Sequence, residues 1–131
     1  MIVLDASATV EFLLGSQRGQ RIGDRLGVRD RDNHAPHLMD IEVAHVLRRA
    51  ADQGRLSETR AREALVHLAQ LRLTRWAHDT LLPRVWSLRH NATAYDAAYL
   101  ALAEALGAPL LTCDASLADL PGHDATVEVV V

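Results

Sequence analysis

The chain of 131 residues has a formal net charge of −3, and all fourteen of its basic residues are arginines, so no mechanism that needs a lysine is open to it. This balance excludes a sequence-wide basic surface for nucleic acid, the single cysteine excludes an internal disulfide, and no apolar stretch approaches membrane-spanning length. We therefore expect a cytoplasmic protein without a signal peptide or membrane contact, folded as a single domain over residues 1–131.

The first half of the chain alternates short apolar runs with segments of helical periodicity. The expected elements are a strand over residues 2–4, helices over 8–14 and 18–26, a loop over 27–33, a weak strand over 34–37 and an apolar helix over 38–51. Gly54 follows the last of these helices at a position that favours a left-handed residue. Ser57 is a suitable N-cap for a further helix, whose apolar face would be formed by Ala61, Leu65, Leu68 and Leu71.

The second half of the chain continues this alternation of strands and helices. The expected elements are a strand over residues 73–77, a helix from residue 80 or 83 to 89, a helix that is capped by Thr93 and ends at residue 106, a strand over 110–113, a short helix over 115–120 and a strand over 126–131. Strands that alternate with helices predict an α/β fold, in which a parallel sheet is covered by helices.

Four acidic residues stand in apolar surroundings, where acids are rare unless they are paired or bind a ligand. Asp5 and Asp114 follow two of the buried strands, whereas Glu42 and Asp96 lie in the first turns of the two most apolar helices. The carboxyl ends of parallel strands and the starts of the following helices meet at one edge of a sheet, so all four side chains can converge. They would repel one another by roughly 1–4 kcal/mol per pair, and a hard divalent cation would relieve that repulsion.

Three of these acids also have a purely structural interpretation. Asp5 and Asp114 could cap the helices that follow them, and Asp96 stands three residues after Thr93 as in a capping box. Capping does not explain Glu42, which lies within an apolar helix. The joint pattern of four acids therefore favours a metal site over four separate caps.

Four segments, taken in order, carry a resemblance to a known family: residues 1–7, Glu42 on its apolar helix with Arg48 and Arg49 near its end, residues 95–101, and residues 110–114. They resemble the PIN domain, specifically the VapC-type toxins of bacterial type II toxin–antitoxin operons, over essentially the whole chain. The resemblance implies a PIN-like three-layer sandwich with a central, mostly parallel sheet of about five strands covered by helices.

The same resemblance implies an activity and a set of site residues. The implied activity is metal-dependent endoribonuclease cleavage of RNA, with Mg²⁺ as the cofactor and Mn²⁺ as a possible substitute, although the number of ions stays open. Ser7 and Thr112 would be auxiliary hydroxyl groups that orient a carboxylate or a water, with helix capping and strand packing as their structural alternatives. The catalytic and metal-binding quartet would be Asp5, Glu42, Asp96 and Asp114.

The implied partners are an RNA substrate, a cognate VapB-like antitoxin that covers the acidic site, and a second copy of the chain in a homodimer. DNA would be contacted only indirectly, through the antitoxin. The rival hypothesis is a PIN-like binding module whose nuclease is catalytically inactive, and a metal-dependent RNase assay would separate the two.

Other polar and aromatic residues are assigned on simpler grounds. Asp119 is interpreted as part of a solvated helix face, with a water-mediated metal role as the alternative. No second Cys or His cluster completes a zinc site around His34, His37 and His45. The arginines at helical spacing could form a solvated helix face, contact RNA phosphates or face an acidic partner. They are Arg18, Arg21 and Arg25. A core or an interface, rather than a platform for base stacking, is expected for Trp76, Trp86, Tyr95 and Tyr99.

Overall fold

The computed structural model describes residues 1–26 and 32–131, and within them five short strands form one parallel sheet. The order of the strands across this sheet is β3-β2-β1-β4-β5. Each neighbouring pair is parallel, as the α/β prediction requires. Their bounds are β1 Ile2–Leu4, β2 Asn33–Pro36, β3 Thr74–Trp76, β4 Leu110–Thr112 and β5 Val127–Val129.

The neighbouring strands β1 and β4 are apolar except for Thr112 at the end of β4, because both faces of the sheet are covered. Side chains of a strand alternate between faces, so Val3 and Leu110 enter one hydrophobic cluster while Leu4 and Leu111 enter the other. Each of these four side chains is at most 1% exposed. A continuous apolar run is therefore the expected pattern for these strands, in contrast to the alternation of a half-exposed strand.

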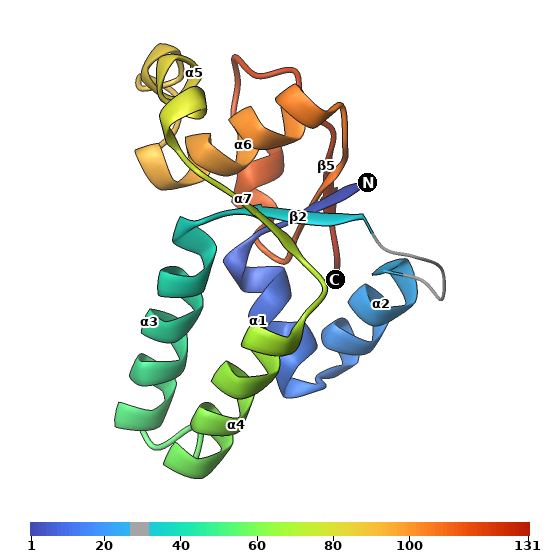
Figure 1. Cartoon of the computed structure of the whole chain (residues 1–131), viewed down its shortest axis with the longest axis vertical. Coiled ribbons are helices and arrows are strands. Elements are labelled where there is room, and N and C mark those ends of the chain that lie inside the picture. The colour runs from blue at the N-terminus through green and yellow to red at the C-terminus, as the bar shows by residue number, and fades with distance from the viewer. Residues whose placement is uncertain (27–31) are drawn as a thin grey trace.

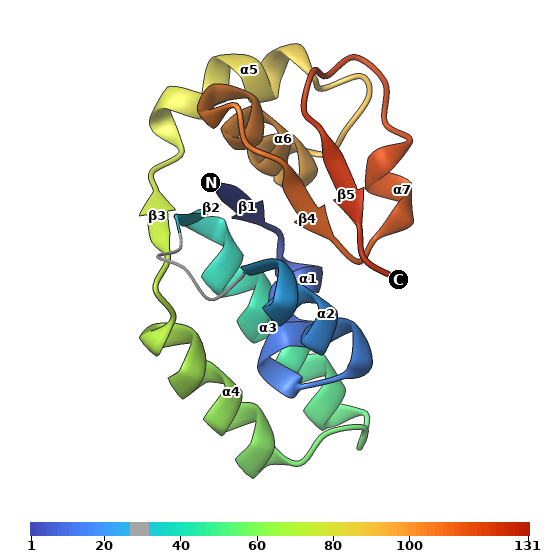
Figure 2. The ribbon, with the colours of Figure 1, turned by 90° about the vertical axis from the view of Figure 1, so that its right-hand side faces the viewer.

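Helices lie on both sides of this sheet and give the molecule its three layers. In Figures 1 and 2, helices α5 and α6 lie on one side of the sheet, and α1 to α4 lie on the other. Helices α3 and α4 run side by side away from the sheet. The helices are α1 Ala6–Leu14, α2 Gln17–Leu26, α3 Leu38–Asp52, α4 Glu58–Gln70, the 3₁₀ turn η1 Asp79–Leu81, α5 Leu82–Ser87, α6 Ala94–Leu106 and α7 Ala115–Ala118.

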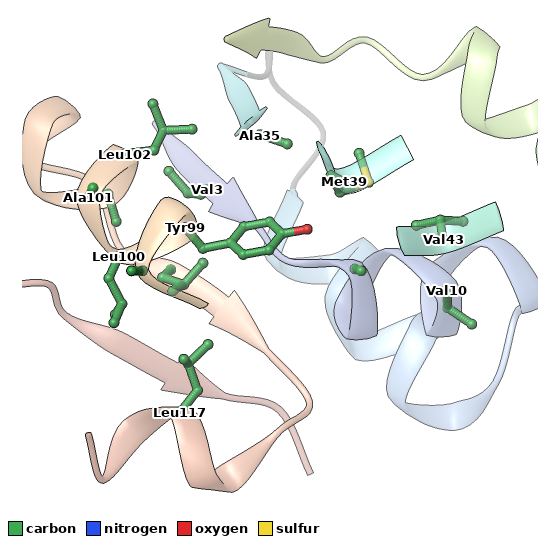
Figure 3. Close-up of a cluster of buried hydrophobic side chains, with 14 of the residues drawn as sticks. Val3, Val10, Ala35, Met39, Val43, Tyr99, Leu100, Ala101, Leu102 and Leu117 are labelled. Atoms are coloured by element: carbon green, nitrogen blue, oxygen red, sulfur yellow. The ribbon is translucent and has the colours of Figure 1, made fainter. Parts of the chain in front are cut away.

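Helix α6 forms the centre of the larger hydrophobic cluster, which explains its almost entirely apolar sequence. Its residues from 97 to 103 are all buried. Figure 3 shows Leu100 and Leu102 on the same side as Val3, while the ring of Tyr99 reaches across toward Met39 and Val43 of α3. Burying a leucine side chain of this kind contributes roughly 1.5–3 kcal/mol, so α6 anchors the sheet.

Most predicted elements are confirmed, with shifts at their ends. Helix α1 begins at Ala6 rather than residue 8, because Asp5 is its N-cap and accepts a hydrogen bond from the Ala8 amide at 2.9 Å. Gly54 has the predicted left-handed conformation, with a φ angle of 73°. The predicted loop over 27–33 falls partly outside the described residues, at 27–31, and its last residue, Asn33, belongs to β2.

The predicted apolar face of α4 is partly wrong. Leu65 is 39% exposed, and the face that packs against the core is formed by Ala61, Ala64 and Leu68. The helix predicted to end at residue 89 consists of η1 followed by α5, which ends at Ser87. No helix in the described part of the chain is both long and apolar enough to cross a membrane.

Candidate active site

The four predicted acids meet at one pocket beside the carboxyl ends of β1 and β4. The pocket has a volume of about 730 Å³. Asp5 follows β1, and Asp114 follows the neighbouring strand β4. Asp96 lies in the first turn of α6 as predicted, but Glu42 lies one turn further into α3 than the first turn. The pocket is lined by Asp5, Ala6, Ser7, Val10, Glu11, Arg18, Ile41, Glu42, His45, Val46, Tyr95, Asp96, Tyr99, Cys113 and Asp114.

Asp5 is the most buried of these acids, with only 6% of its surface exposed. Its Oδ1 accepts hydrogen bonds from the Ser7 hydroxyl at 2.7 Å and the Ala8 amide at 2.9 Å, and its Oδ2 accepts one from the Thr112 hydroxyl. Burial raises the pKa of the Asp5 carboxyl, whereas these three donors act to lower it. Asp5 therefore both caps α1 and presents a firmly held carboxylate to the pocket.

The two predicted auxiliary hydroxyls orient Asp5 and tie the ends of β1 and β4 together. Ser7 Oγ accepts a hydrogen bond from the Cys113 amide at 2.9 Å, and Thr112 Oγ1 accepts one from the Asp114 amide at 2.9 Å. A hydroxyl has a single proton to donate, and in both residues Asp5 accepts it. Both hydroxyls thus favour the ionised form of Asp5, against the burial that raises its pKa.

Glu42 is held by a tyrosine whose polar role the sequence analysis did not predict. The Tyr99 hydroxyl donates a hydrogen bond to Glu42 Oε1 at 2.6 Å, although its ring is buried in the core (Figure 3). Burial raises the pKa of Glu42, this hydrogen bond lowers it, and the charges of Asp96 and Asp5 raise it again. The sequence pattern that could have indicated this role is the spacing on the helix, because Tyr99 follows Asp96 by three residues and shares its helix face.

Asp96 and Asp114 keep the capping contacts that the sequence suggested for this part of the chain. The Thr93 hydroxyl accepts a hydrogen bond from the Asp96 amide at 3.2 Å, and Asp114 Oδ1 accepts one from the Ser116 amide at 3.0 Å. Asp96 is half-buried, and burial together with the charge of Asp114 raises the pKa of its carboxyl. Asp114 is exposed, so its apolar sequence neighbours do not bury it.

The donor atoms at this pocket fit a hard divalent cation. They are carboxylate oxygens from four separate elements, and a hard cation prefers oxygen ligands. Mutual repulsion contributes to the raised pKa values of Asp5, Glu42 and Asp96. Within residues 1–26 and 32–131, however, no three Asp, Glu, His or Cys side chains already surround a metal position. The carboxylates face one pocket but are not drawn together, as their like charges dictate.

The three histidines that were considered as zinc ligands lie in different surroundings. His34 is buried in β2, where its Nδ1 accepts a hydrogen bond from the Trp76 indole at 2.9 Å. His37 packs edge-on against His78, and of the three predicted histidines His45 alone lines the acidic pocket. Each of the three histidines thus has its own neighbours in the structure.

Comparison with known proteins decides the family. The PIN domain family matches residues 2–122. The chain belongs to the PIN-domain family. Among curated members, Ribonuclease VapC12 of Mycobacterium tuberculosis is 41% identical over 99% of both chains, and Ribonuclease VapC1 of the same organism is 43% identical over 98% of this chain and 96% of its own. These relatives place the chain among the VapC ribonucleases.

A solved structure agrees with this PIN assignment at the level of the fold. A toxin–antitoxin complex from Klebsiella pneumoniae contains a chain that matches with a TM-score of 0.66 at 19% identity, over 100% of this chain and 98% of that one. The predicted PIN-like sandwich is thus confirmed by the sheet order and by this likeness.

Further residues at the PIN pocket were not predicted from the sequence as site residues. Glu11 adds a fifth carboxylate to the lining, and Ile41 and Val46 of α3 add exposed apolar surface beside the acids. Asp119, in contrast, is exposed at the end of α7 and does not line this pocket, in agreement with its solvated interpretation. A core position is wrong for Trp86 and Tyr95, because both are more than 60% exposed.

Replacing Tyr99 by phenylalanine is expected to lower the free energy of unfolding by about 1 kcal/mol, because Glu42 then loses a buried hydrogen-bond donor. Urea unfolding of the metal-free protein measures this change. Tyr95→Phe is the matched control: Tyr95 lies on the same helix, but its side chain is exposed and makes no hydrogen bond to any described residue. Equal stability of the two variants would show that the Tyr99 hydroxyl does not hold Glu42.

Proposed function

We propose that this chain is a metal-dependent endoribonuclease and the toxin of a type II toxin–antitoxin pair. Its membership of the VapC ribonucleases supports the substrate class and the biological role. The observation that carries the proposal is the convergence of four carboxylates, from four separate elements, on one pocket. Such a pocket suits hydrolysis by an activated water, because the lining Ser7 hydroxyl donates its proton to Asp5 and burial raises the pKa of the Cys113 thiol.

In this proposal the four carboxylates hold Mg²⁺, or Mn²⁺ in its place. When bound, the ion supplies a Lewis acid for the phosphodiester and lowers the pKa of a water molecule. Ser7 and Thr112 orient the Asp5 carboxylate and act to lower its pKa through their hydroxyl protons. Tyr99 does the same for Glu42. The protein's contribution is thus to present oriented charges at fixed positions, because misplaced ligands weaken both binding and catalysis.

The proposed partners are a small antitoxin, an RNA and a second copy of this chain. The structural likeness to a toxin–antitoxin complex supports the antitoxin. The exposed side chains of Ile41 and Val46 beside the carboxylates suit a partner that combines apolar contacts with a basic group over the acids. For the homodimer, the exposed apolar side chains of Leu82 and Trp86 on α5 offer candidate contact surface.

The proposal is tested by incubating the purified chain, freed of antitoxin, with a circular single-stranded RNA. We expect cleavage in Mg²⁺ or Mn²⁺ and none in EDTA. A circular substrate has no ends, so only an endonuclease can open it. Contaminating metal-independent ribonucleases are recognised because their activity persists in EDTA. If Mg²⁺ raises the melting temperature but no RNA is cleaved, the chain is instead the catalytically inactive binding module.

A further inference from the structure

One guanidinium group stands on the wall of the acidic pocket. It belongs to Arg18, at the second residue of α2, and its side chain is 45% exposed. Its Nη2 lies 3.3 Å from Oε1 of Glu11, a fifth pocket acid, on α1. The other oxygen of Glu11 accepts a hydrogen bond from the Ser16 hydroxyl, just before α2 begins. Arg18 is thus held at the pocket by a single ion pair whose partner is itself fixed.

The start of α2 is held tightly against α1, which fixes where Arg18 projects. At Gly19 a Cβ atom would approach the backbone oxygen of Glu11 to 2.0 Å, so only glycine allows this contact. The Gly19 amide also donates to Ser16 Oγ at 3.0 Å. The position of Arg18 beside the pocket therefore follows from close packing of the backbone and not from the side chain alone.

The other two arginines of the same helix stripe are directed elsewhere. Arg21 donates to the backbone oxygen of Val131, and Arg25 contacts Glu128 at 2.6 and 3.1 Å. Both line a separate surface beside the end of β5. Helical spacing suggested one continuous basic stripe, but the structure assigns Arg18 alone of the three to the acidic pocket.

An acidic pocket that takes a polyanion needs a donor for phosphate as well as a cation for its carboxylates. In the described residues, the pocket lining contains five carboxylates and Arg18 as its one arginine. A guanidinium presents parallel N–H donors that match the oxygens of a phosphate group. Exposed ion pairs contribute little to stability, so the Arg18 guanidinium can readily exchange Glu11 for a stronger acceptor such as a phosphate.

We propose that Arg18 binds a phosphate of the RNA strand beside the scissile bond and that Glu11 positions it there when RNA is absent. This inference rests on the proposed ribonuclease function and adds a substrate-binding residue to it. Glu11 acts here through Arg18 and is a positioning residue.

The test compares Arg18→Ala with Arg21→Ala, a substitution of the same kind one helical turn away. Both are made in an Asp96→Asn parent, which is expected not to cleave RNA, and the binding of a labelled single-stranded RNA is followed by fluorescence anisotropy in Mg²⁺. Loss of the Arg18 contact should weaken binding by about tenfold, the typical effect of a hydrogen bond to a charged group. The dependence of log K on log salt should also fall by about 0.7, as expected for one lost phosphate contact on a single strand.

Arg21→Ala should leave the RNA affinity and its salt dependence at the values of the parent protein. Arg18→Lys should bind RNA with intermediate affinity, because lysine keeps the positive charge but lacks the parallel N–H donors of a guanidinium. Equal RNA affinities of the Arg18→Ala and Arg21→Ala proteins would overturn the inference. If Arg18→Ala also lowers the melting temperature in EDTA, the role of Arg18 is to offset the negative charge of the pocket carboxylates and not to bind RNA.

A parallel cleavage assay of the wild-type protein distinguishes failure of the inference on Arg18 from failure of the proposed function. If the wild-type protein cleaves RNA while Arg18→Ala binds normally, the inference on Arg18 fails and the proposed function stands. If the wild-type protein neither cleaves nor binds RNA in Mg²⁺, the proposed function fails, and the role of Arg18 fails with it.

Discussion

Replacing Asp96 by asparagine is expected to lower the rate of metal-dependent RNA cleavage at least about a hundredfold. The substitution removes one negative charge from the four carboxylates that line the pocket and leaves the shape of the side chain almost unchanged. Asp96 is half-buried, and its backbone amide donates the capping hydrogen bond to the Thr93 hydroxyl, so Asp96→Asn preserves that bond at the start of α6. Single-turnover cleavage in Mg²⁺ measures the loss directly.

Asp119→Asn provides the matched control for this experiment. Asp119 is an acid at the C-terminal end of α7 that is exposed and does not line the pocket, so its variant should cleave at the wild-type rate. Asp5→Asn should be as inactive as Asp96→Asn, yet it also perturbs three hydrogen bonds that Asp5 accepts. Asp96 is therefore the cleaner position, and full activity of its variant would remove it from the site.

The sequence was sufficient to predict the fold class and the convergence of the four acids on one pocket, because both depend on local patterns. Strands such as β1, which are buried on both faces, are mostly apolar, and an acid directly after such a strand, as at Asp5, faces the edge where parallel strands end. The order of strands and helices then implies which ends meet. These relations depend on topology and not on details of packing, so they can be read before the structure is known.

The contacts that orient those acids could not be predicted in the same way. Tyr99 has an aromatic ring in the core and a hydroxyl at the pocket, and the pattern of α6 indicates only its burial. Similarly, Arg18 and Arg21 share a helical stripe, but their different partners depend on the angle between α1 and α2 and on where β5 ends. Such assignments require tertiary geometry, because long polar side chains reach several neighbours from one backbone position.

Magnesium should raise the melting temperature of the wild-type protein much more than that of Asp96→Asn. The metal-free pocket contains partly buried carboxylates whose pKa values are raised by burial and by one another. A raised pKa in the folded state means that the metal-free protein loses stability as the pH rises through that pKa. Mg²⁺ should offset this loss by binding the native state alone, with a stabilisation of about 2.7 kcal/mol at one hundred times Kd.

The two variants that serve the cleavage assay also decide this prediction. In EDTA at neutral pH, Asp96→Asn should melt at or above the wild-type temperature, because one of the repelling charges is gone. It should then gain much less from added Mg²⁺, whereas Asp119→Asn should respond to the metal like the wild type. If Asp96 serves only to begin α6, the opposite pattern is expected: a lower melting temperature in EDTA and an unchanged response to Mg²⁺. Melting curves of the three proteins in EDTA and across a Mg²⁺ titration therefore distinguish a metal ligand from a structural acid without any RNA.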